Sequence, residues 1–225
     1  MTQLILAALF FIGLHFGIAG TALRQVIVER LGEARYRIAF SALSLGGLVW
    51  LIHAYRYAGY VETWGQLHWF KPVAAVLMLA AFLLAVLGLT TPNPTAVDGE
   101  RFLESEQPAI GILRVTRHPF LWGVALWAAT HLIVNGDVAS FLLFGSLLVL
   151  VLGGMASIDK KRHKLFGKQW DRFAAMTSVI PFAAIRRGRN RLVWSEFRWW
   201  QPLLTLAAYG AMMHFHLRWF GVAPW

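Results

Sequence analysis

Cysteine is absent from the 225 residues of this chain. Its absence excludes disulfide bonds, iron–sulfur clusters, zinc–thiolate sites and the covalent attachment of a c-type haem. A metal ion in this protein must therefore be held by histidine, by carboxylates or within a prosthetic group. Eight histidines are available for that role.

Charged residues are also scarce, at 14% of the chain, against about a quarter in soluble domains. Hydrophobic residues make up 58%. They occur in blocks of about 20, the length that an α-helix needs to cross a lipid bilayer. The composition predicts an all-α, polytopic transmembrane helix bundle in the lipid bilayer, and we interpret residues 1–225 as one domain.

Six spans are expected, each bounded by charged residues or helix breakers. The first lacks the basic start and the small-residue cleavage site of a signal peptide, so we interpret it as a retained helix. The expected spans cover residues 3–23, 38–56, 71–91, 118–134, 138–158 and 200–220.

Basic residues predict how these spans are oriented. Of the 21 lysines and arginines, 18 fall in three segments that alternate onto one side: after the first span, after the third, and between the fifth and sixth. The positive-inside rule places these segments in the cytoplasm and both termini on the opposite side. The membrane thus explains the net charge of +10, and no nucleic-acid partner is expected.

The segment 158–199 is too charged to span a bilayer. Its basic residues alternate with aromatic and aliphatic ones, which is typical of a segment that lies on the membrane surface against anionic lipid. We therefore predict a cytoplasmic, interfacial segment whose apolar residues face the membrane: Phe166, Trp170, Phe173, Ile180, Phe182 and Trp194.

Histidines inside the spans are the candidates for chemistry, because an ionisable side chain is costly in a membrane. His118 and His131 are 13 residues apart, about 20 Å along one helix, so they cannot hold one metal together. A two-histidine site needs another helix, and His15 in the first span is the best candidate. Ala19 near His15, and Gly123 and Trp127 near His131, would leave space and an aromatic wall for a flat cofactor. The alternative is close helix packing around core histidines.

Other histidines allow several roles. His53, His214 and His216 could bind a second metal or haem, a substrate, or a ligand's outer shell. His118 follows Arg117 at a helix entrance, where it could cap the loop or bind an anionic group beside Arg114. The span interiors contain no acidic residue, which argues against a carboxylate proton relay. No phosphate loop, zinc-protease motif or nucleophile elbow occurs.

Three runs resemble known proteins. The run RHPFLWGVALWAATHLIVNGDVAS, from Arg117, resembles the NnrU family of bacterial membrane proteins. The run KLFGKQWDRFAAMTSVIPFAAIRRGR, from Lys164, resembles the related zeta-carotene isomerase family of plants and cyanobacteria. The opening run FIGLHFGIAGTALR resembles the amino-terminal half of the same group.

The resemblance implies a haem b protein of the bacterial inner membrane. It implies that His15 and His131 are axial iron ligands and catalytic residues; His118 matches a further family histidine and His53 matches one more loosely. The isomerase family implies cis–trans isomerisation of a carotenoid or similar hydrophobic polyene, with redox control of the iron ligands. The NnrU family implies instead a haem protein or accessory factor of denitrification. The electron donor stays open.

Two further hypotheses assign the protein to other functional classes. The RHPxxxG pattern with a later FG and IPF also resembles membrane methyltransferases that use S-adenosylmethionine. Those enzymes have acidic residues before the FG, where this chain has Asp159 followed by a basic run, Lys160 to Lys164. The other reading is a scaffold or assembly factor without chemistry of its own.

Overall fold

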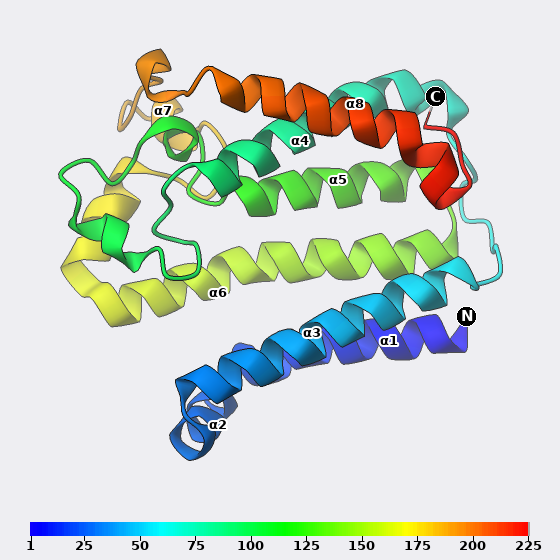
Figure 1. Cartoon of the computed structure of the whole chain (residues 1–225), viewed down its shortest axis with the longest axis horizontal. Coiled ribbons are helices and arrows are strands. Elements are labelled where there is room, and N and C mark those ends of the chain that lie inside the picture. Colours follow the sequence, from blue (N-terminus) through cyan, green and yellow to red (C-terminus); the bar gives the residue numbers. More distant parts are fainter. Residues whose placement is uncertain (225) are drawn as a thin grey trace. The chain divides into compact units, whose positions relative to one another are not determined.

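Helices form wherever the sequence has a long apolar block, and the computed structural model, which describes residues 1–224, contains no β-strand within that range (Figure 1). The predicted all-α fold is confirmed. The main helices are α1 (Thr2–Gly13), α2 (Leu23–Leu31), α3 (Glu33–Arg56), α4 (Lys71–Thr90), α5 (Pro119–Asn135), α6 (Val138–Met176), α7 (Ala183–Arg186) and α8 (Trp200–Phe220). A π-helix, η1 (Leu14–Ala19), continues α1, and short 3-10 turns cover His68–Phe70, Glu100–Glu104, Gly111–Arg114 and Trp194–Glu196.

A helix forms at each of the six expected spans. In the part of the chain that the structure describes, four segments are long and apolar enough to cross a bilayer: Thr2–Ala19, Glu33–Arg56, His68–Thr90 and Val138–Phe166. The helix Pro119–Asn135 is apolar but shorter. The sixth expected span corresponds to α8, which does not reach the same hydropathy.

Three expected boundaries are wrong. The second span starts earlier than residue 38, because α3 begins at Glu33. The first span ends at Ala19, before a turn and the separate helix α2. The fifth does not stop at residue 158, because α6 runs on to Met176. Gly167 interrupts it with φ 43° and ψ −116°, a conformation that favours glycine. The chain bends there rather than at the charged residues.

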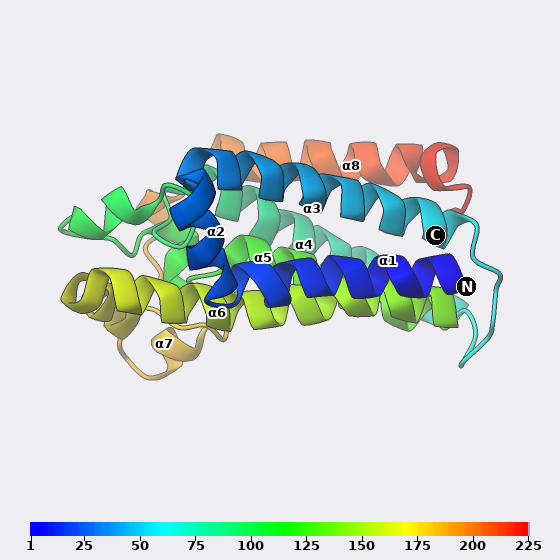
Figure 2. The same ribbon diagram turned by 90° about the horizontal axis from the view of Figure 1, so that it is seen from below.

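The chain divides into two compact units, and the division falls within α5 and α6. The first unit contains Met1–His68 and His131–Leu150. In it α1 lies antiparallel beside α3, as both views show (Figures 1 and 2). Gly47 permits the close approach, since a Cβ there would lie 2.9 Å from the Phe10 ring. The loop after α3 pairs with the end of α5 through Leu67 N–H to the Val134 carbonyl, at 3.0 Å.

The second unit contains Trp69–Thr130 and the chain from Val151 onward. In it α4 lies antiparallel beside α8 (Figures 1 and 2). Two hydrogen bonds join the pair: the Gln201 amide donates to Thr90 Oγ1 at 2.8 Å, and the Tyr209 hydroxyl donates to the Ala75 carbonyl at 3.0 Å.

The loop between α4 and α5 packs on the second half of α6. Leu103, Ala109 and Leu113 of the loop form a buried cluster with Trp170 and Phe173. The prediction that these two aromatic residues face the membrane is therefore wrong: the loop covers them. Ile180, Phe182 and Trp194 of the same predicted segment do remain exposed.

Candidate functional site

His15 lies in the π-helical turn η1, and π-helical turns occur often at functional sites. Its Nδ1 is 2.8 Å from the carbonyl oxygen of Phe11. A carbonyl only accepts, so Nδ1 carries the proton and Nε2 keeps its lone pair. Nε2 has no hydrogen-bond partner within residues 1–224. This is the arrangement in which a histidine binds a metal, with its second nitrogen fixed by the backbone.

Two aromatic rings pack against His15, which is half-buried. The ring centroids of Phe11 and Phe40 lie 4.6 and 5.3 Å from the centroid of the imidazole. Ala19 follows in the same π-helical turn and is half-buried. The surroundings of His15 are therefore apolar and carry no charged hydrogen-bond partner.

His131 is half-buried near the end of α5 and stacks on Phe144 of α6, with ring centroids 4.9 Å apart. Phe144 also meets Tyr55 of α3 edge-on at 5.8 Å. The Tyr55 hydroxyl joins a polar chain there, 3.0 Å from Ser140 Oγ, which in turn donates to buried Asp137 at 2.6 Å. His131 thus lies beside a network that ties α3 to the start of α6.

The structure does not bring His15 and His131 together. His15 contacts Phe40, whereas His131 is linked through Phe144 to Tyr55, 15 residues further along α3. That separation corresponds to about 22 Å of helix. Two imidazoles that share a metal have ring nitrogens only about 4 Å apart, since each metal–nitrogen bond is about 2 Å. The two histidines lie in one compact unit but at different levels of it.

The remaining predicted residues are dispersed. The space expected beside Gly123 is filled by α4, because a Cβ on Gly123 would lie 2.8 Å from the Ala81 carbonyl. Trp127 is half-buried on α5, and His53 is exposed near the end of α3. His214 is exposed and His216 half-buried on α8, with His216 Nδ1 2.8 Å from the Val222 carbonyl.

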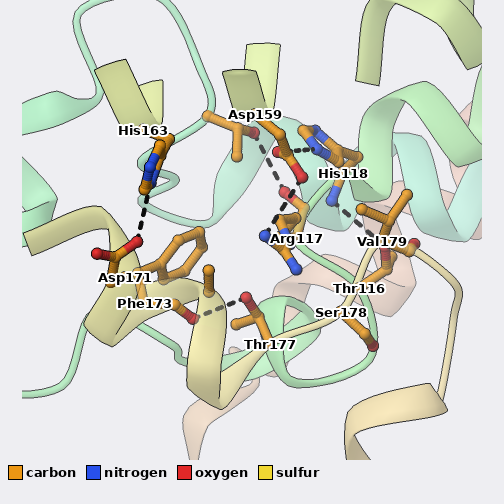
Figure 3. Close-up of polar contacts among 12 residues, drawn as sticks. Thr116, Arg117, His118, Asp159, His163, Asp171, Phe173, Thr177, Ser178 and Val179 are labelled. Carbon is orange, nitrogen blue, oxygen red and sulfur yellow. Dashed lines mark hydrogen bonds and ion pairs between the residues drawn. The ribbon is translucent and has the colours of Figure 1, made fainter. Parts of the chain in front are cut away.

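His118 is buried in the second unit, with 1% of its surface exposed. Its Nε2 lies 2.8 Å from Asp159 Oδ1 of α6, and Arg117 Nη1 lies 3.3 Å from the other carboxylate oxygen (Figure 3). The anionic group predicted for His118 is therefore a side chain of the same protein. Arg114, which we expected beside it, pairs with Glu196 instead.

Two buried nitrogens in this cluster have no hydrogen-bond partner within residues 1–224: His118 Nδ1 and Arg117 Nε. Burial lowers the pKa of Arg117, and the negative charge of Asp159 partly opposes that change. The Arg117 guanidinium also lies 5.8 Å from the centre of the Trp170 ring. The cluster thus joins the start of α5 to both halves of α6.

The two most distinctive sequence runs meet at this cluster. Arg117 N–H donates to the Ser178 carbonyl at 2.9 Å, and Phe182 N–H donates to the Val115 carbonyl at 2.8 Å. The Thr116 hydroxyl and the Trp122 indole both donate to the Val179 carbonyl, at 2.7 and 2.8 Å. Phe182 adopts a left-handed φ of 62°, which is rare for a bulky residue. The TSVIPF segment, residues 177–182, is therefore hydrogen-bonded along the segment that contains the RHP motif, residues 117–119.

Arg114 and Glu196 form a second polar contact, with two hydrogen bonds of 2.7 and 2.6 Å. Gly111 N–H also donates to Glu196, at 2.7 Å. The hydrogen bonds from Arg114 are the main cause that lowers the pKa of Glu196. Glu196 holds the 3-10 turn of Gly111–Arg114 in place.

Sequence reasoning missed Asp159 and Glu196 as partners of the basic residues. Asp159 carried a signal, since it is the last acidic residue before a basic run, but a predicted span end at residue 158 hid it. Sequence reasoning also missed the hydrogen-bonded chain Tyr55–Ser140–Asp137, although two of its members lie in residues 117–140, the run that resembles the NnrU family.

No group of three or more histidine and carboxylate side chains within residues 1–224 is arranged to hold a metal ion. Iron held in a porphyrin needs only one or two protein ligands, because the ring supplies the others. His15 meets that requirement, with a free Nε2 and apolar aromatic walls. The residues present therefore fit a haem with His15 as one axial ligand.

The fold defines an all-helical protein with several helices apolar and long enough to cross a membrane, with His15 in a π-helical turn of one unit and a buried Arg–His–Asp cluster in the other. The chain belongs to the NnrU family, whose model, described as NnrU protein, matches residues 3–224. No solved structure matches the chain.

Two curated relatives are chloroplastic proteins named 15-cis-zeta-carotene isomerase. The protein from Arabidopsis thaliana is 29% identical over 194 residues, and that from Zea mays is 28% identical over 201 residues. Each alignment covers 84% of this chain and 52% of the relative. The chain therefore spans about half the length of the curated relatives it matches.

Proposed function

We propose that this protein is a haem-dependent membrane isomerase that converts a cis double bond of a carotenoid or similar linear polyene to trans. The observation that carries the proposal is the similarity to two zeta-carotene isomerases over most of the chain. The geometry of His15 supports the haem.

Each part of the proposal has a physical role. A bound haem b would supply a redox-active iron. His15 would hold the iron through Nε2, while the Phe11 carbonyl fixes its tautomer. Phe11 and Phe40 would exclude water from the imidazole and offer flat, apolar contacts to a conjugated chain.

His131 is the proposed second axial ligand. In the structure its contacts lie about 22 Å further along α3 than those of His15, so ligation of one iron by both residues would require α5 to shift by several helical turns relative to η1. If haem were bound, His131 would be the histidine whose ligation could be exchanged, because it lies further from His15 and its aromatic neighbours. His15 would then be the resident iron ligand, and His131 the exchangeable one.

The test begins with an absorption spectrum of the full chain, purified in detergent and loaded with haem. We expect a Soret band that His15→Ala loses, whereas His131→Ala keeps haem but changes its spin state. His163→Ala is the matched control, because His163 is exposed and paired only with Asp171; its spectrum should equal that of the wild type.

Activity is then measured with reduced protein and cis-zeta-carotene, with products separated by chromatography. The wild type should form the trans isomer, and His15→Ala and His131→Ala should each lose most of that activity. A protein without a Soret band overturns the haem proposal. A haem-loaded protein that leaves the polyene unchanged overturns the isomerase and favours the denitrification role.

A further inference from the structure

Residues 178–199, which include α7, lie at the end of the long helices of the second unit. The indole of Trp122, near the start of α5, donates to the Val179 carbonyl at the beginning of this segment, at 2.8 Å. The segment ends where α8 begins, and Gln201 of α8 donates to Thr90 Oγ1 at the end of α4, at 2.8 Å (Figure 1). The segment is therefore level with the end of the candidate membrane span that contains α4.

Positive charge in this segment is not balanced by acidic side chains. It carries five arginines and one glutamate, and that glutamate, Glu196, is already paired with Arg114 of the loop before α5. Arg189 donates to the Ala175 carbonyl at 2.7 Å. The side chains of the other four arginines are exposed and have no hydrogen-bond or ion-pair partner within residues 1–224: Arg186, Arg187, Arg191 and Arg198. These guanidinium groups are free to bind phosphate oxygens.

Large apolar side chains flank these arginines and are also exposed. Trp194 and Trp199 have exposed fractions of 77% and 78%, and Ile180 and Phe182 have 66% and 50%. Side chains of this size seldom stay in water unless another surface covers them. Tryptophan is enriched where a bilayer meets water, because its ring is apolar and its N–H is polar.

The position of the segment distinguishes between possible anionic partners. An acidic protein or a free anion would match the arginines, but neither explains why they lie level with the end of a candidate membrane span. Phospholipid headgroups lie at that level, and the acyl chains just below them are an apolar layer for the exposed rings. Only an anionic lipid surface accounts for the charge, the exposed aromatic residues and the position together.

We propose that residues 178–199 bind the headgroups of anionic phospholipids. The unpaired arginines contact the phosphates, while Trp194, Trp199 and Phe182 insert between the headgroups. The sequence predicted an interfacial segment over residues 158–199, and the structure narrows it to these side chains because the α4–α5 loop covers Trp170 and Phe173. The proposal is independent of haem and of the polyene.

The test measures which lipids surround this segment. The chain has no cysteine, so Ser195→Cys can carry a single NBD fluorophore on an exposed position between the two tryptophans. The full chain is placed in nanodiscs of phosphatidylcholine mixed with phosphatidylglycerol, and one of the two lipids carries a spin label that quenches NBD. We expect spin-labelled phosphatidylglycerol to be enriched about fivefold over phosphatidylcholine, the effect of one basic residue at an anionic surface, and high salt to reduce the enrichment.

Charge variants separate lipid binding from structural effects. Arg186→Gln combined with Arg187→Gln should lower the enrichment at least about twofold, because two of the four unpaired charges are lost. Arg186→Lys combined with Arg187→Lys keeps the charge and should keep the enrichment. Arg56→Gln combined with Arg218→Gln is the matched control, because both arginines are exposed and lie outside the segment; it should leave the enrichment unchanged.

Several results would overturn the inference. Equal quenching by the two lipids would show that the segment does not select anionic headgroups. Absence of quenching by either lipid would show that it lies in water and faces a soluble partner. Equal losses in the glutamine, lysine and control variants would show that the arginine charges are not responsible. Because no haem or polyene is used, each of these results leaves the isomerase proposal intact, and failure of that proposal leaves lipid binding intact.

Discussion

At the scale of single residues, the most demanding contact is the buried Arg117–His118–Asp159 cluster. A charge taken out of water is stable only with a close partner, and removing the Asp159 carboxylate would leave the buried Arg117 without one. Helix α6, which carries Asp159, also carries an exposed pair, His163 and Asp171, whose side chains are 2.9 Å apart. Water can take the place of either side chain in that exposed pair. The two pairs offer a matched comparison of burial.

We expect Asp159→Asn to lower the free energy of unfolding by about 3–5 kcal/mol, because the buried Arg117 loses its carboxylate partner. His118→Ala should lower it by about 1–3 kcal/mol, because Asp159 keeps its ion pair with Arg117 and loses one hydrogen bond. His163→Ala should change it by less than about 0.5 kcal/mol, as exposed ion pairs contribute little. Thermal or denaturant unfolding in detergent measures both. Equal small effects at the two pairs would show that the buried cluster has no role in stability.

Glu196 makes stability depend on pH. Its pKa is lowered in the folded protein, so its contribution is fully present above the unfolded pKa of about 4.3 and is lost as pH falls through the folded value. Glu196→Gln should therefore be less stable than the wild type at pH 7, and the difference should shrink below about pH 4. Unfolding temperatures measured between pH 3 and pH 8 check this; a gap that is constant with pH would contradict it.

At the scale of elements, close contact between α4 and α5 depends on two glycines. A Cβ on Gly88 would lie 2.5 Å from the backbone nitrogen of Phe120, and one on Gly123 would lie 2.8 Å from the Ala81 carbonyl. Both neighbours are backbone atoms, which cannot turn aside as a side chain can. The helices approach because these positions carry no side chain.

Gly88→Ala and Gly123→Ala should each destabilise the protein by about 1–3 kcal/mol, the usual cost of overpacking. Gly154→Ala in α6 is the control, since nothing lies within 4 Å of its Cβ position. Alanine there should be neutral or stabilise by up to about 1 kcal/mol through helix propensity. Equal effects at Gly154 and Gly88 would refute the close-packing account.

At the scale of the whole molecule, the distribution of basic residues predicts the orientation in the membrane. The chain has no cysteine, so a single introduced thiol can be labelled without background. Thr63 and Ser195 are both exposed and lie in loops assigned to opposite sides.

In intact cells, a membrane-impermeant maleimide should label Thr63→Cys and not Ser195→Cys, whereas broken membranes should allow both. The reason is the preference of lysine- and arginine-rich segments for the cytoplasmic side. The reverse labelling pattern would invert the topology, and with it the location of both termini.

Much of the fold could be predicted from the sequence, because apolar blocks of membrane length leave the backbone few options other than a helix. The boundaries of α8 match residues 200–220 as expected, while α6 runs past its predicted end. The part of α6 beyond residue 158 is stabilised because the α4–α5 loop covers Trp170 and Phe173. Local hydropathy does not contain that information.

For the candidate site, residue type alone identified His15, His118 and His131 as unusual, since ionisable groups are costly inside a membrane protein. Their partners came only from tertiary structure: the π-helical turn and the Phe11 carbonyl for His15, Phe144 for His131, Asp159 for His118. Asp159 lies 41 residues from His118, and no spacing rule connects them. The hydropathy and charge of a segment are properties of its own residues, so the sequence determines them directly. The partner of a buried polar group depends instead on which helices pack together in the tertiary structure.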